Sequence, residues 1–127
     1  MTNDQTASRS PKTILVVDDD EMVRDLLCAI LEKHYTLLVA RNGVEAIELY
    51  ARHSSQLQGV LTDWRMPQKN GSEVVAHIRQ ENPEIPILVM SGDLEESEAE
   101  RLQCQEHVGF LRKPFSEREL LAVMAGW

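Results

Sequence analysis

Five short apolar segments, separated by longer stretches with helical spacing, constrain the fold of this chain more than any other feature. The segments are residues 13–18 (TILVVD), 36–40 (TLLVA), 59–63 (GVLTD), 85–90 (IPILVM) and 108–111 (VGFL). Three of them consist almost entirely of Ile, Leu and Val, which is typical of strands buried on both faces of a parallel sheet. A half-exposed antiparallel sheet would instead show alternating polar and apolar residues. The pattern therefore predicts five parallel strands.

The stretches between these segments carry apolar residues at the spacing of an amphipathic helix. The first stretch has a stripe at positions i, i+3, i+4, i+7 and i+8, formed by Val23, Leu26, Leu27, Ile30 and Leu31. The later stripes are shorter: Ala46, Ile47 and Tyr50; Val74, Val75 and Ile78; Ala99 and Leu102; Leu120, Leu121 and Met124. A repeated βα unit implies right-handed crossovers, so we predict an α/β fold of the (βα)5 type, with a parallel sheet between two helical layers. The fourth helix is acid-rich, which indicates either a solvated face or an adjustable output surface.

Length and composition indicate one globular domain behind a polar N-terminal segment. The chain has 127 residues, of which 43% are hydrophobic and 27% charged, close to the averages for globular domains. Residues 1–12 lack an apolar period and are expected to form a flexible leader, followed by a single domain over residues 13–127. Cys28 and Cys104 are too few for a disulfide framework and form no CxxC motif, which fits a reducing compartment.

The charge balance argues against two classes of partner. The formal net charge is -8 at pH 7, so a broad basic surface for direct contact with nucleic acid or anionic lipid is not expected. No apolar run approaches the roughly 18 residues that cross a bilayer, and residues 1–12 lack the apolar stretch of a signal peptide. We therefore expect a cytoplasmic protein without a membrane partner.

Polar side chains stand at the ends of four of the five predicted strands. Asp18, Asp19 and Asp20 close the first strand, Asp63 ends the third, Ser91 follows the fourth, and Lys113 follows the fifth. In an open parallel sheet, ligands collect outside the carboxyl ends of the strands. Crowded carboxylates repel one another, and a hard divalent cation with oxygen ligands holds them ionised.

The donor set at these strand ends indicates magnesium and phosphoryl chemistry. Carboxylates, a carbonyl and water suit Mg²⁺, whereas zinc or iron would call for His or Cys, which these positions lack. The cation would leave Asp63 free to attack phosphorus. Lys113 and the Ser91 hydroxyl would then meet the oxygens of the transferred group.

Each residue also has an ordinary structural interpretation when it is taken alone. Asp19 or Asp20 is a candidate N-cap for the helix that begins near Glu21. Asp63 alone is compatible with a turn, Ser91 with a helix cap, and Lys113 with a solvated loop. Their joint placement at the ends of four strands favours the phosphoryl site.

Four motifs resemble those of receiver domains of the two-component response-regulator family, in the family's order and at its usual intervals. They are VVDDD, LTDWRMPQKNG, LVMSGD and GFLRKPF. The resemblance runs from about Thr13 to about Met124. It implies a flavodoxin-like sheet with the strand order 2-1-3-4-5.

The resemblance also implies specific roles for the acidic residues and their neighbours. Asp63 would be the phospho-acceptor, taking phosphate from a phosphohistidine on a sensor histidine kinase or a histidine phosphotransfer protein. Asp19 would ligate Mg²⁺ directly and Asp18 largely through water, while the main-chain carbonyl of Arg65 would supply a further ligand. Mn²⁺ is the expected substitute for Mg²⁺.

A switch mechanism follows from the same resemblance. Ser91 occupies the position of the family's switch hydroxyl, Lys113 that of its phosphate-pairing lysine, and Phe110 that of its rotameric aromatic. The resemblance further makes the Lys113-Pro114 peptide cis. Phosphorylation adds charge and three strong acceptors, so Ser91 and Lys113 would move toward the new group and Phe110 would turn inward. Phe110 is equally compatible with an ordinary core aromatic.

The expected output is a change in partner binding, and the protein is not expected to be an enzyme with an external substrate. The surface formed by the fourth helix, the fifth strand and the last helix would alter its preference for a downstream protein. The domain would assist only its own Mg²⁺-dependent phosphotransfer and a slow autodephosphorylation. We expect a monomer or a weak phosphorylation-dependent dimer.

Arg65 and Asp93 depart from the commonest members of the family. Arg65 lies two residues after the acceptor Asp63, and Asp93 lies two residues after Ser91. We hypothesise that they pair across the mouth of the site and hinder an attacking water, which would give a long-lived phosphoryl group.

Three alternatives of other classes are weighed against this interpretation. A pseudo-receiver would bind partners without phosphorylation, although every expected site residue is present. A phosphatase of the haloacid-dehalogenase type needs Asp-x-Asp followed by x and Thr or Val, whereas Asp20 is followed here by Glu21 and Met22. A flavodoxin would need a Ser-, Thr- and Gly-rich phosphate cradle after the first strand.

Whether the receiver is free-standing or part of a hybrid kinase stays open, and Trp127 is expected to be an exposed aromatic.

Overall fold

The computed structural model describes residues 12–66, 70–93 and 95–127. The strands are β1 (Lys12–Val17), β2 (Tyr35–Ala40), β3 (Leu57–Asp63), β4 (Ile87–Ser91) and β5 (Val108–Arg112). The helices are α2 (Glu21–Leu31), α3 (Gly43–His53), α4 (Gly71–Glu81), α5 (Glu96–Gln103) and α6 (Glu117–Met124). The leader expected over residues 1–12 lies outside the described residues except for Lys12, which is the first residue of β1.

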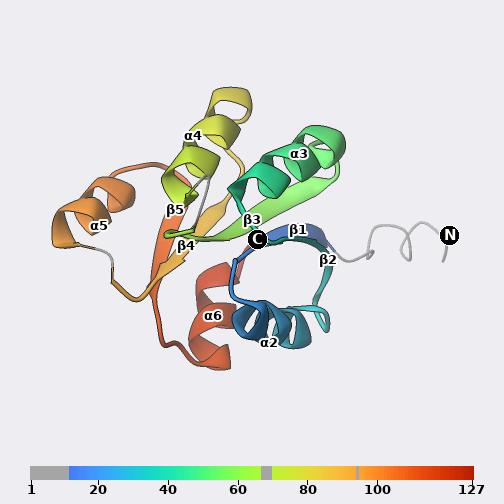
Figure 1. The fold of residues 1–127 in the computed structure, drawn as a ribbon, viewed down its shortest axis with the longest axis horizontal. Coiled ribbons are helices and arrows are strands. Elements are labelled where there is room, and N and C mark those ends of the chain that lie inside the picture. Colours follow the sequence, from blue (N-terminus) through green and yellow to red (C-terminus); the bar gives the residue numbers. More distant parts are fainter. Residues whose placement is uncertain (1–11, 67–69, 94) are drawn as a thin grey trace, which may run out of the picture.

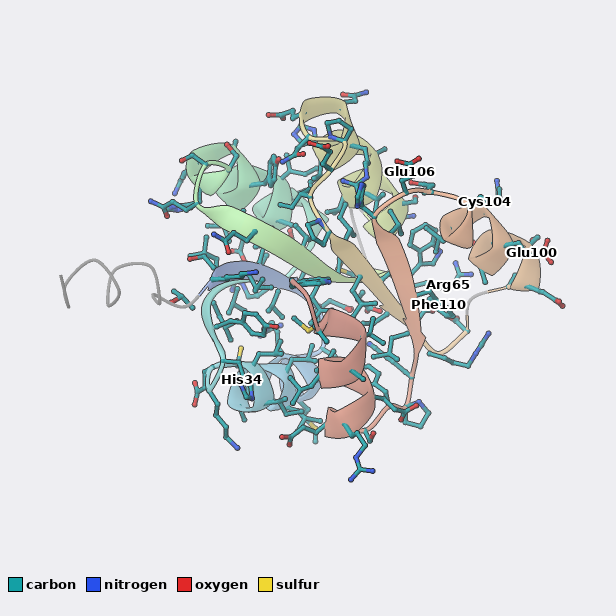
Figure 2. All side chains as sticks on the ribbon, turned by 180° about the vertical axis from the view of Figure 1, so that it is seen from behind. His34, Arg65, Glu100, Cys104, Glu106 and Phe110 are labelled. Carbon is teal, nitrogen blue, oxygen red and sulfur yellow. The ribbon has the colours of Figure 1, made fainter. Side chains whose placement is uncertain are left out.

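The five strands form one parallel sheet in the order β2-β1-β3-β4-β5. Helices α3, α4 and α5 cover one face of the sheet, and α2 and α6 cover the other (Figure 1). The view from behind shows the same two groups of helices on opposite sides (Figure 2). The predicted (βα)5 three-layer architecture and the strand order implied by the family resemblance are both confirmed.

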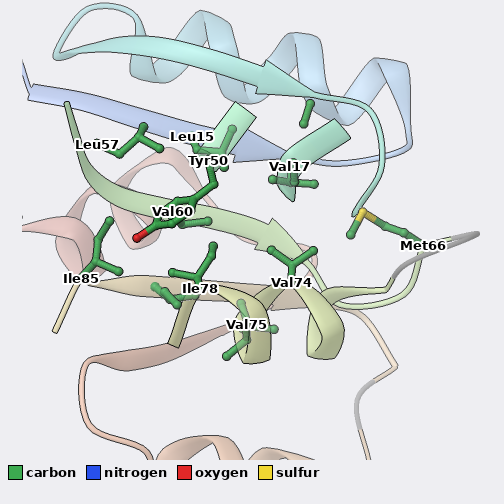
Figure 3. Close-up of a cluster of buried hydrophobic side chains, with 14 of the residues drawn as sticks. Leu15, Val17, Tyr50, Leu57, Val60, Met66, Val74, Val75, Ile78 and Ile85 are labelled. Atoms are coloured by element: carbon green, nitrogen blue, oxygen red, sulfur yellow. The ribbon is translucent and has the colours of Figure 1, made fainter. Parts of the chain in front are cut away.

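Two hydrophobic cores form because successive side chains of a strand point to opposite faces of the sheet. In β1, Leu15 and Val17 belong to the core beneath α3, α4 and α5, whereas Ile14 and Val16 belong to the core beneath α2 and α6. Figure 3 shows the first of these cores, with Tyr50 of α3 packed among side chains of the sheet and of α4. β1 is buried from Ile14 to Val17, as expected for a central parallel strand.

Most helices begin with a side chain that satisfies their free backbone N–H groups. Asp20, Asn42, Asn70 and Ser116 each accept hydrogen bonds from the first turn of the helix that follows, which stabilises the helix start. Asn70 and Ser116 are part of capping boxes with Glu73 and Glu119. These local signals set where each helix begins relative to the strand end before it.

Two sequence-based expectations about apolar side chains are wrong. Leu26, predicted as part of the apolar stripe of α2, is 59% exposed, because the stripe meets the core through Leu27, Ile30 and Leu31, with Val23 partly buried beside them. Trp127 is half-buried against the core beneath α2 and α6. A Cβ on Gly59 would lie 2.4 Å from its ring, so the missing side chain at Gly59 makes the room that Trp127 occupies.

Two further properties of the described residues bear on the expectations above. Cys28 and Cys104 are both free thiols; Cys28 is partly buried and Cys104 is exposed. Among the residues that the structure describes, no helix has the length and apolar character that a membrane span requires.

Candidate functional site

The sheet brings the strand-end residues to one edge. Asp18 directly follows β1, Asp63 is the last residue of β3, Ser91 is the last residue of β4, and Lys113 directly follows β5. The register pairs Asp63 with Met90 and Ser91 with Arg112, so these ends lie at nearly the same level. Parallel strands share a carboxyl edge, which is where ligands bind in folds of this type.

Three carboxylates gather at this edge. Asp18, Asp19 and Asp63 each offer an oxygen within 4.8 Å of the others. Asp18 is completely buried, Asp63 is 8% exposed, and Asp19 is exposed. Asp20 instead caps α2, since its Oδ1 accepts hydrogen bonds from the N–H groups of Met22 and Val23 at 2.9 and 3.3 Å. The helix-cap interpretation is therefore right for Asp20, which leaves Asp18 and Asp19 available.

Lys113 lies between two of these carboxylates. Its Nζ donates to Asp18 Oδ2 at 3.1 Å and to Asp63 Oδ1 at 3.3 Å. Burial would lower the pKa of Lys113, but the attraction of Asp18 and Asp63 outweighs burial and raises this pKa, so the ammonium stays charged. The Lys113-Pro114 peptide bond is cis, as the family resemblance implied.

The site has more negative charge than Lys113 compensates. Burial, followed by repulsion from Asp18, raises the pKa of Asp63 to about 6, although Lys113 and the Trp64 N–H act in the opposite direction. A carboxyl whose ionisation is opposed in this way fits an additional cation. The donor atoms of the three acids are all oxygens, which suits Mg²⁺. The residues present therefore fit the magnesium ion that the sequence indicated.

Backbone contacts fix the two loops that carry the acids. Arg24 of α2 donates from Nη1 to the Asp18 carbonyl at 3.0 Å, and the Asp20 N–H donates to Asp18 Oδ1 at 2.9 Å. The Trp64 N–H donates to Asp63 Oδ1 at 3.0 Å. Arg24 was not predicted as a site residue, because a charged residue beside an apolar helical stripe looks like an ordinary solvated position.

Ser91 is engaged by Asp93. Its hydroxyl donates to Asp93 Oδ1 at 3.1 Å, and the Asp93 N–H donates back to Ser91 Oγ at 3.3 Å. Arg65 Nε donates to the same Asp93 Oδ1 at 3.1 Å. The structure thus contains the Arg65–Asp93 ion pair that we hypothesised from the sequence, and the hydrogen bond from Ser91, with Arg65 adding to it, lowers the pKa of Asp93.

Phe110 lies half-buried in β5 and packs against the core beneath α3, α4 and α5. The guanidinium carbon of Arg112, two residues further along the strand, is 5.5 Å from the centre of the ring. This distance is within the range of a cation–π contact. The position is compatible with both interpretations of Phe110, the switch aromatic and the core aromatic.

An apolar surface lies beside Lys113. Met22 and Leu26 of α2 are 82% and 59% exposed. Between α2 and the segment after β5 is an open groove of about 390 Å³, with a mainly apolar lining of Val23, Leu26, Lys113, Pro114 and Phe115. Exposed apolar groups next to a polar site mark a surface where another molecule can dock.

The sequence matches one protein family over nearly its whole length. The model of the family described as "Response regulator receiver domain" matches residues 14–125. The chain is 31% identical to the chemotaxis protein CheY of Halobacterium salinarum over 111 residues, which cover 87% of this chain and 91% of that protein. It is 38% identical over 117 residues to the response regulator MprA of Mycobacterium sp. (strain KMS), covering 90% of this chain.

Some curated relatives are much longer than the matched region. The match covers 49% of MprA, and a 33% identical match to the sensor kinase CckA of Brucella abortus covers 85% of this chain but 12% of that protein. The chain thus spans about half of one of these relatives and a small part of the other.

Solved structures support the same fold. A CheX–CheY–BeF3–Mg complex from Borrelia burgdorferi has a chain that superposes with a TM-score of 0.85 at 22% identity, covering 94% of this chain and 92% of that one. The signal receiver domain of an HD domain-containing protein from Pseudomonas fluorescens Pf-5 gives a TM-score of 0.78 at 29% identity, covering 91% and 85%.

Proposed function

The chain belongs to the response regulator receiver domain family, and we propose that it is a phospho-accepting switch whose acceptor is Asp63. The observation that carries this proposal is the buried Asp63 carboxylate, placed beside Asp18 and within 3.3 Å of the Lys113 ammonium. We further propose that residues 13–127 form the receiver domain and that its phosphoryl donor is a phosphohistidine on a sensor kinase or a histidine phosphotransfer protein.

In the proposed transfer, an Asp63 carboxylate oxygen attacks the phosphorus of the phosphohistidine. The new O–P bond forms as the N–P bond breaks, and the histidine nitrogen keeps the electron pair of the broken bond. Asp63 has to be ionised for this attack. Lys113, which already contacts Asp63 Oδ1, is placed to pair with an oxygen of the transferred group. The Ser91 hydroxyl would donate to another such oxygen after leaving Asp93.

Asp18, Asp19, Asp63 and the main-chain carbonyl of Arg65 would hold Mg²⁺, with Mn²⁺ as a substitute. When bound, the cation supplies positive charge that offsets the charge of the phosphoryl oxygens. Arg24 would support the site by holding the Asp18 carbonyl, and the Trp64 N–H would fix one oxygen of Asp63.

The donor protein has to approach the edge of the sheet that carries Asp63. We propose that it contacts the exposed Met22 and Leu26 and the groove beside Lys113, because this apolar surface borders the acceptor. The downstream protein would bind the surface of α5, β5 and α6, which contains Phe110.

The acetyl phosphate reaction tests the acceptor. Incubation of the protein with acetyl phosphate and Mg²⁺ should add the mass of one phosphoryl group, and Asp63→Asn should abolish the gain. Asp20→Asn is the matched control, because it removes a carboxylate from the same loop while Asn still caps α2. A wild-type protein that gains no phosphoryl group would be a pseudo-receiver, and turnover of a generic phosphate ester would indicate a phosphatase.

The Arg65–Asp93 pair is proposed to slow hydrolysis of the phosphoryl group. Its 3.1 Å contact joins the loop after β3 to the loop after β4, and both side chains are largely exposed. Arg65→Ala should therefore lose phosphate faster than the wild type. Equal rates of loss would count against a shielding role.

A further inference from the structure

Trp64 and Arg65, the two residues after the proposed acceptor, both bond to one carboxylate on α5. Trp64 Nε1 donates to Glu98 Oε2 at 3.2 Å, and Arg65 Nη2 donates to Glu98 Oε1 at 3.1 Å. The Glu98 side chain is 22% exposed. Figure 2 shows Arg65 on the α5 side of the molecule. The loop after β3 is therefore tied to a helix more than 30 residues away in the sequence.

The same arginine extends the contact to Ser91. Arg65 Nε and the Ser91 hydroxyl both donate to Asp93 Oδ1, each at 3.1 Å. The hydrogen bonds thus run without interruption from Ser91 through Asp93 and Arg65 to Glu98 and Trp64. We call these five residues the Ser91–Trp64 network. It links the end of β4, the loop after β3 and α5.

Apolar packing holds α5 less firmly than the other helices. Among the side chains of α5 that the structure describes, Leu102 is the buried hydrophobic residue and Ala99 is partly buried. An open cleft of about 320 Å³, lined in part by Trp64, Glu98 and Leu102, lies between α5 and the start of α4. An element with few buried apolar contacts depends more on its polar contacts for its position.

Both carboxylates of the network are in the ionised form that these bonds require. The hydrogen bond from Trp64 is the largest influence that lowers the pKa of Glu98, and Arg65 acts in the same direction. The pKa of Asp93 is lowered chiefly by the Ser91 hydroxyl. Both shifts favour the charged form of the carboxylates that accept the bonds of the network.

We propose that Glu98 is a positioning residue: from α5 it holds Arg65, and through Arg65 and Asp93 it keeps the Ser91 hydroxyl and α5 in the arrangement of the unphosphorylated protein. This inference rests on the proposed function, because a phosphoryl group on Asp63 would recruit the Ser91 hydroxyl. That hydroxyl has to leave Asp93 first, which opens the network at one end. Contacts that exist only in the unphosphorylated arrangement disfavour the phosphorylated arrangement by the free energy that those contacts contribute.

The affinity for BeF3⁻, a stable mimic of a phosphoryl group, tests this coupling. BeF3⁻ is titrated at saturating Mg²⁺ into the wild type, Trp64→Phe, Glu98→Gln and the double variant, and binding is followed by fluorine NMR. Each single variant should bind BeF3⁻ about threefold more tightly, because the unphosphorylated arrangement is less favoured. The double variant should bind no more tightly than Glu98→Gln alone, since the bond from Trp64 acts only through Glu98.

Matched controls separate positioning from charge and from misfolding. Trp64→Phe changes no charge and leaves the bond between Glu98 and the Glu95 N–H in place. Glu100→Gln makes the same charge change as Glu98→Gln on an exposed residue of α5, and it should leave the BeF3⁻ affinity unchanged. The affinity for Mg²⁺ alone should stay within about twofold of the wild type in every variant, because none of the substituted side chains supplies a ligand of the proposed Mg²⁺ site.

Two results would overturn the inference, and they are distinguishable. If the wild type binds BeF3⁻ and Asp63→Asn does not, but Trp64→Phe and Glu98→Gln bind no more tightly than the wild type or Glu100→Gln, Glu98 has no positioning role and the proposed function stands. If the wild type itself fails to bind BeF3⁻ in the presence of Mg²⁺, the proposed function is rejected and this inference with it.

Discussion

At the scale of single residues, the burial of Asp63 has two opposing consequences for its carboxylate. Burial excludes water from the carboxylate but, together with Asp18, raises its pKa to about 6. Lys113 partly offsets this effect at a distance of 3.3 Å. The metal-free protein therefore carries an electrostatic cost at its proposed acceptor, and a bound cation would relieve that cost.

The first prediction concerns the pH dependence of stability without metal. The pKa of Asp63 is higher in the folded protein than the ordinary value of 3.8. The folded state therefore binds more protons than the unfolded state between these values, and stability falls as the pH rises through this range. Asp63→Asn removes this loss, so above about pH 7 the variant should be more stable than the wild type by about 1–3 kcal/mol.

Urea unfolding in a chelator, at about pH 4 and about pH 7.5, measures this difference. The advantage of Asp63→Asn should be largest at the higher pH and nearly absent at the lower one. Asp20→Asn, a change to an exposed cap, should show no such pH dependence. An advantage that is independent of pH would contradict the assignment.

At the scale of elements, the junction between β3 and α4 is built around Gly71. Its N–H donates to the Trp64 carbonyl at 2.7 Å. A Cβ at this position would lie 2.5 Å from the Asp63 carbonyl oxygen and 2.8 Å from Trp64 Cα. These are backbone atoms, so the close approach depends on the absence of a side chain.

The second prediction follows from this junction. Gly71→Ala should destabilise the protein by about 1–3 kcal/mol, although Ala is the better helix former, because the backbone that carries Asp63 has to move. It should also slow phosphorylation by acetyl phosphate. Gly92→Ala is the control in the facing loop, since its Cβ would meet its nearest neighbour at an ordinary 3.7 Å. Equal effects of the two substitutions in a thermal melt would argue against the steric explanation.

The third prediction concerns the exposed apolar face of α2. Leu26→Asp should slow phosphotransfer from a phosphohistidine protein by about tenfold or more, because it places a charge in the proposed docking surface. It should leave the reaction with acetyl phosphate unchanged, since Leu26 is 59% exposed and lies outside the site itself. Val44→Asp, at a partly exposed position on α3, is the matched control. Loss of both reactions in Leu26→Asp would indicate damage to the site.

At the scale of the whole molecule, Trp127 packs against the start of the sheet. Its ring lies over Gly59 in β3, and its carbonyl accepts a hydrogen bond from Lys12 at the beginning of β1. These contacts join the last residue of the chain to two central strands, at the end of the sheet opposite the acidic cluster. The packing of Trp127 should therefore affect stability without affecting phosphorylation.

The fourth prediction is a double-mutant cycle between Gly59 and Trp127. Gly59→Ala should cost about 1–3 kcal/mol in the wild type, because the new Cβ would lie 2.4 Å from the Trp127 ring. In a Trp127→Ala background the same substitution should cost much less, since the obstructing ring is gone. Chemical denaturation of the four proteins gives the coupling. Strictly additive effects would show that the ring does not limit this position.

The sequence predicted both ends of each of the five strands to within two residues, because apolar runs and helical stripes are local signals. The largest differences are at the start of the third strand, Leu57 instead of Gly59, and at the start of the fourth, Ile87 instead of Ile85. In the fourth strand the reason is that Ile85 is buried but precedes the paired residues of the strand, and an apolar residue at the entrance to a strand has the same pattern as one inside it.

Local patterns in the sequence determined the strand ends, and the common direction of parallel strands then placed Asp18, Asp63, Ser91 and Lys113 at one edge. The tertiary structure alone decided which side chains meet across loops, such as Glu98 with Trp64 and Arg65, and which apolar residues stay exposed, such as Leu26. Periodicity specifies the direction in which a side chain points. The residue that a side chain contacts depends on how elements distant in the sequence pack together, and this packing is a property of the folded chain as a whole.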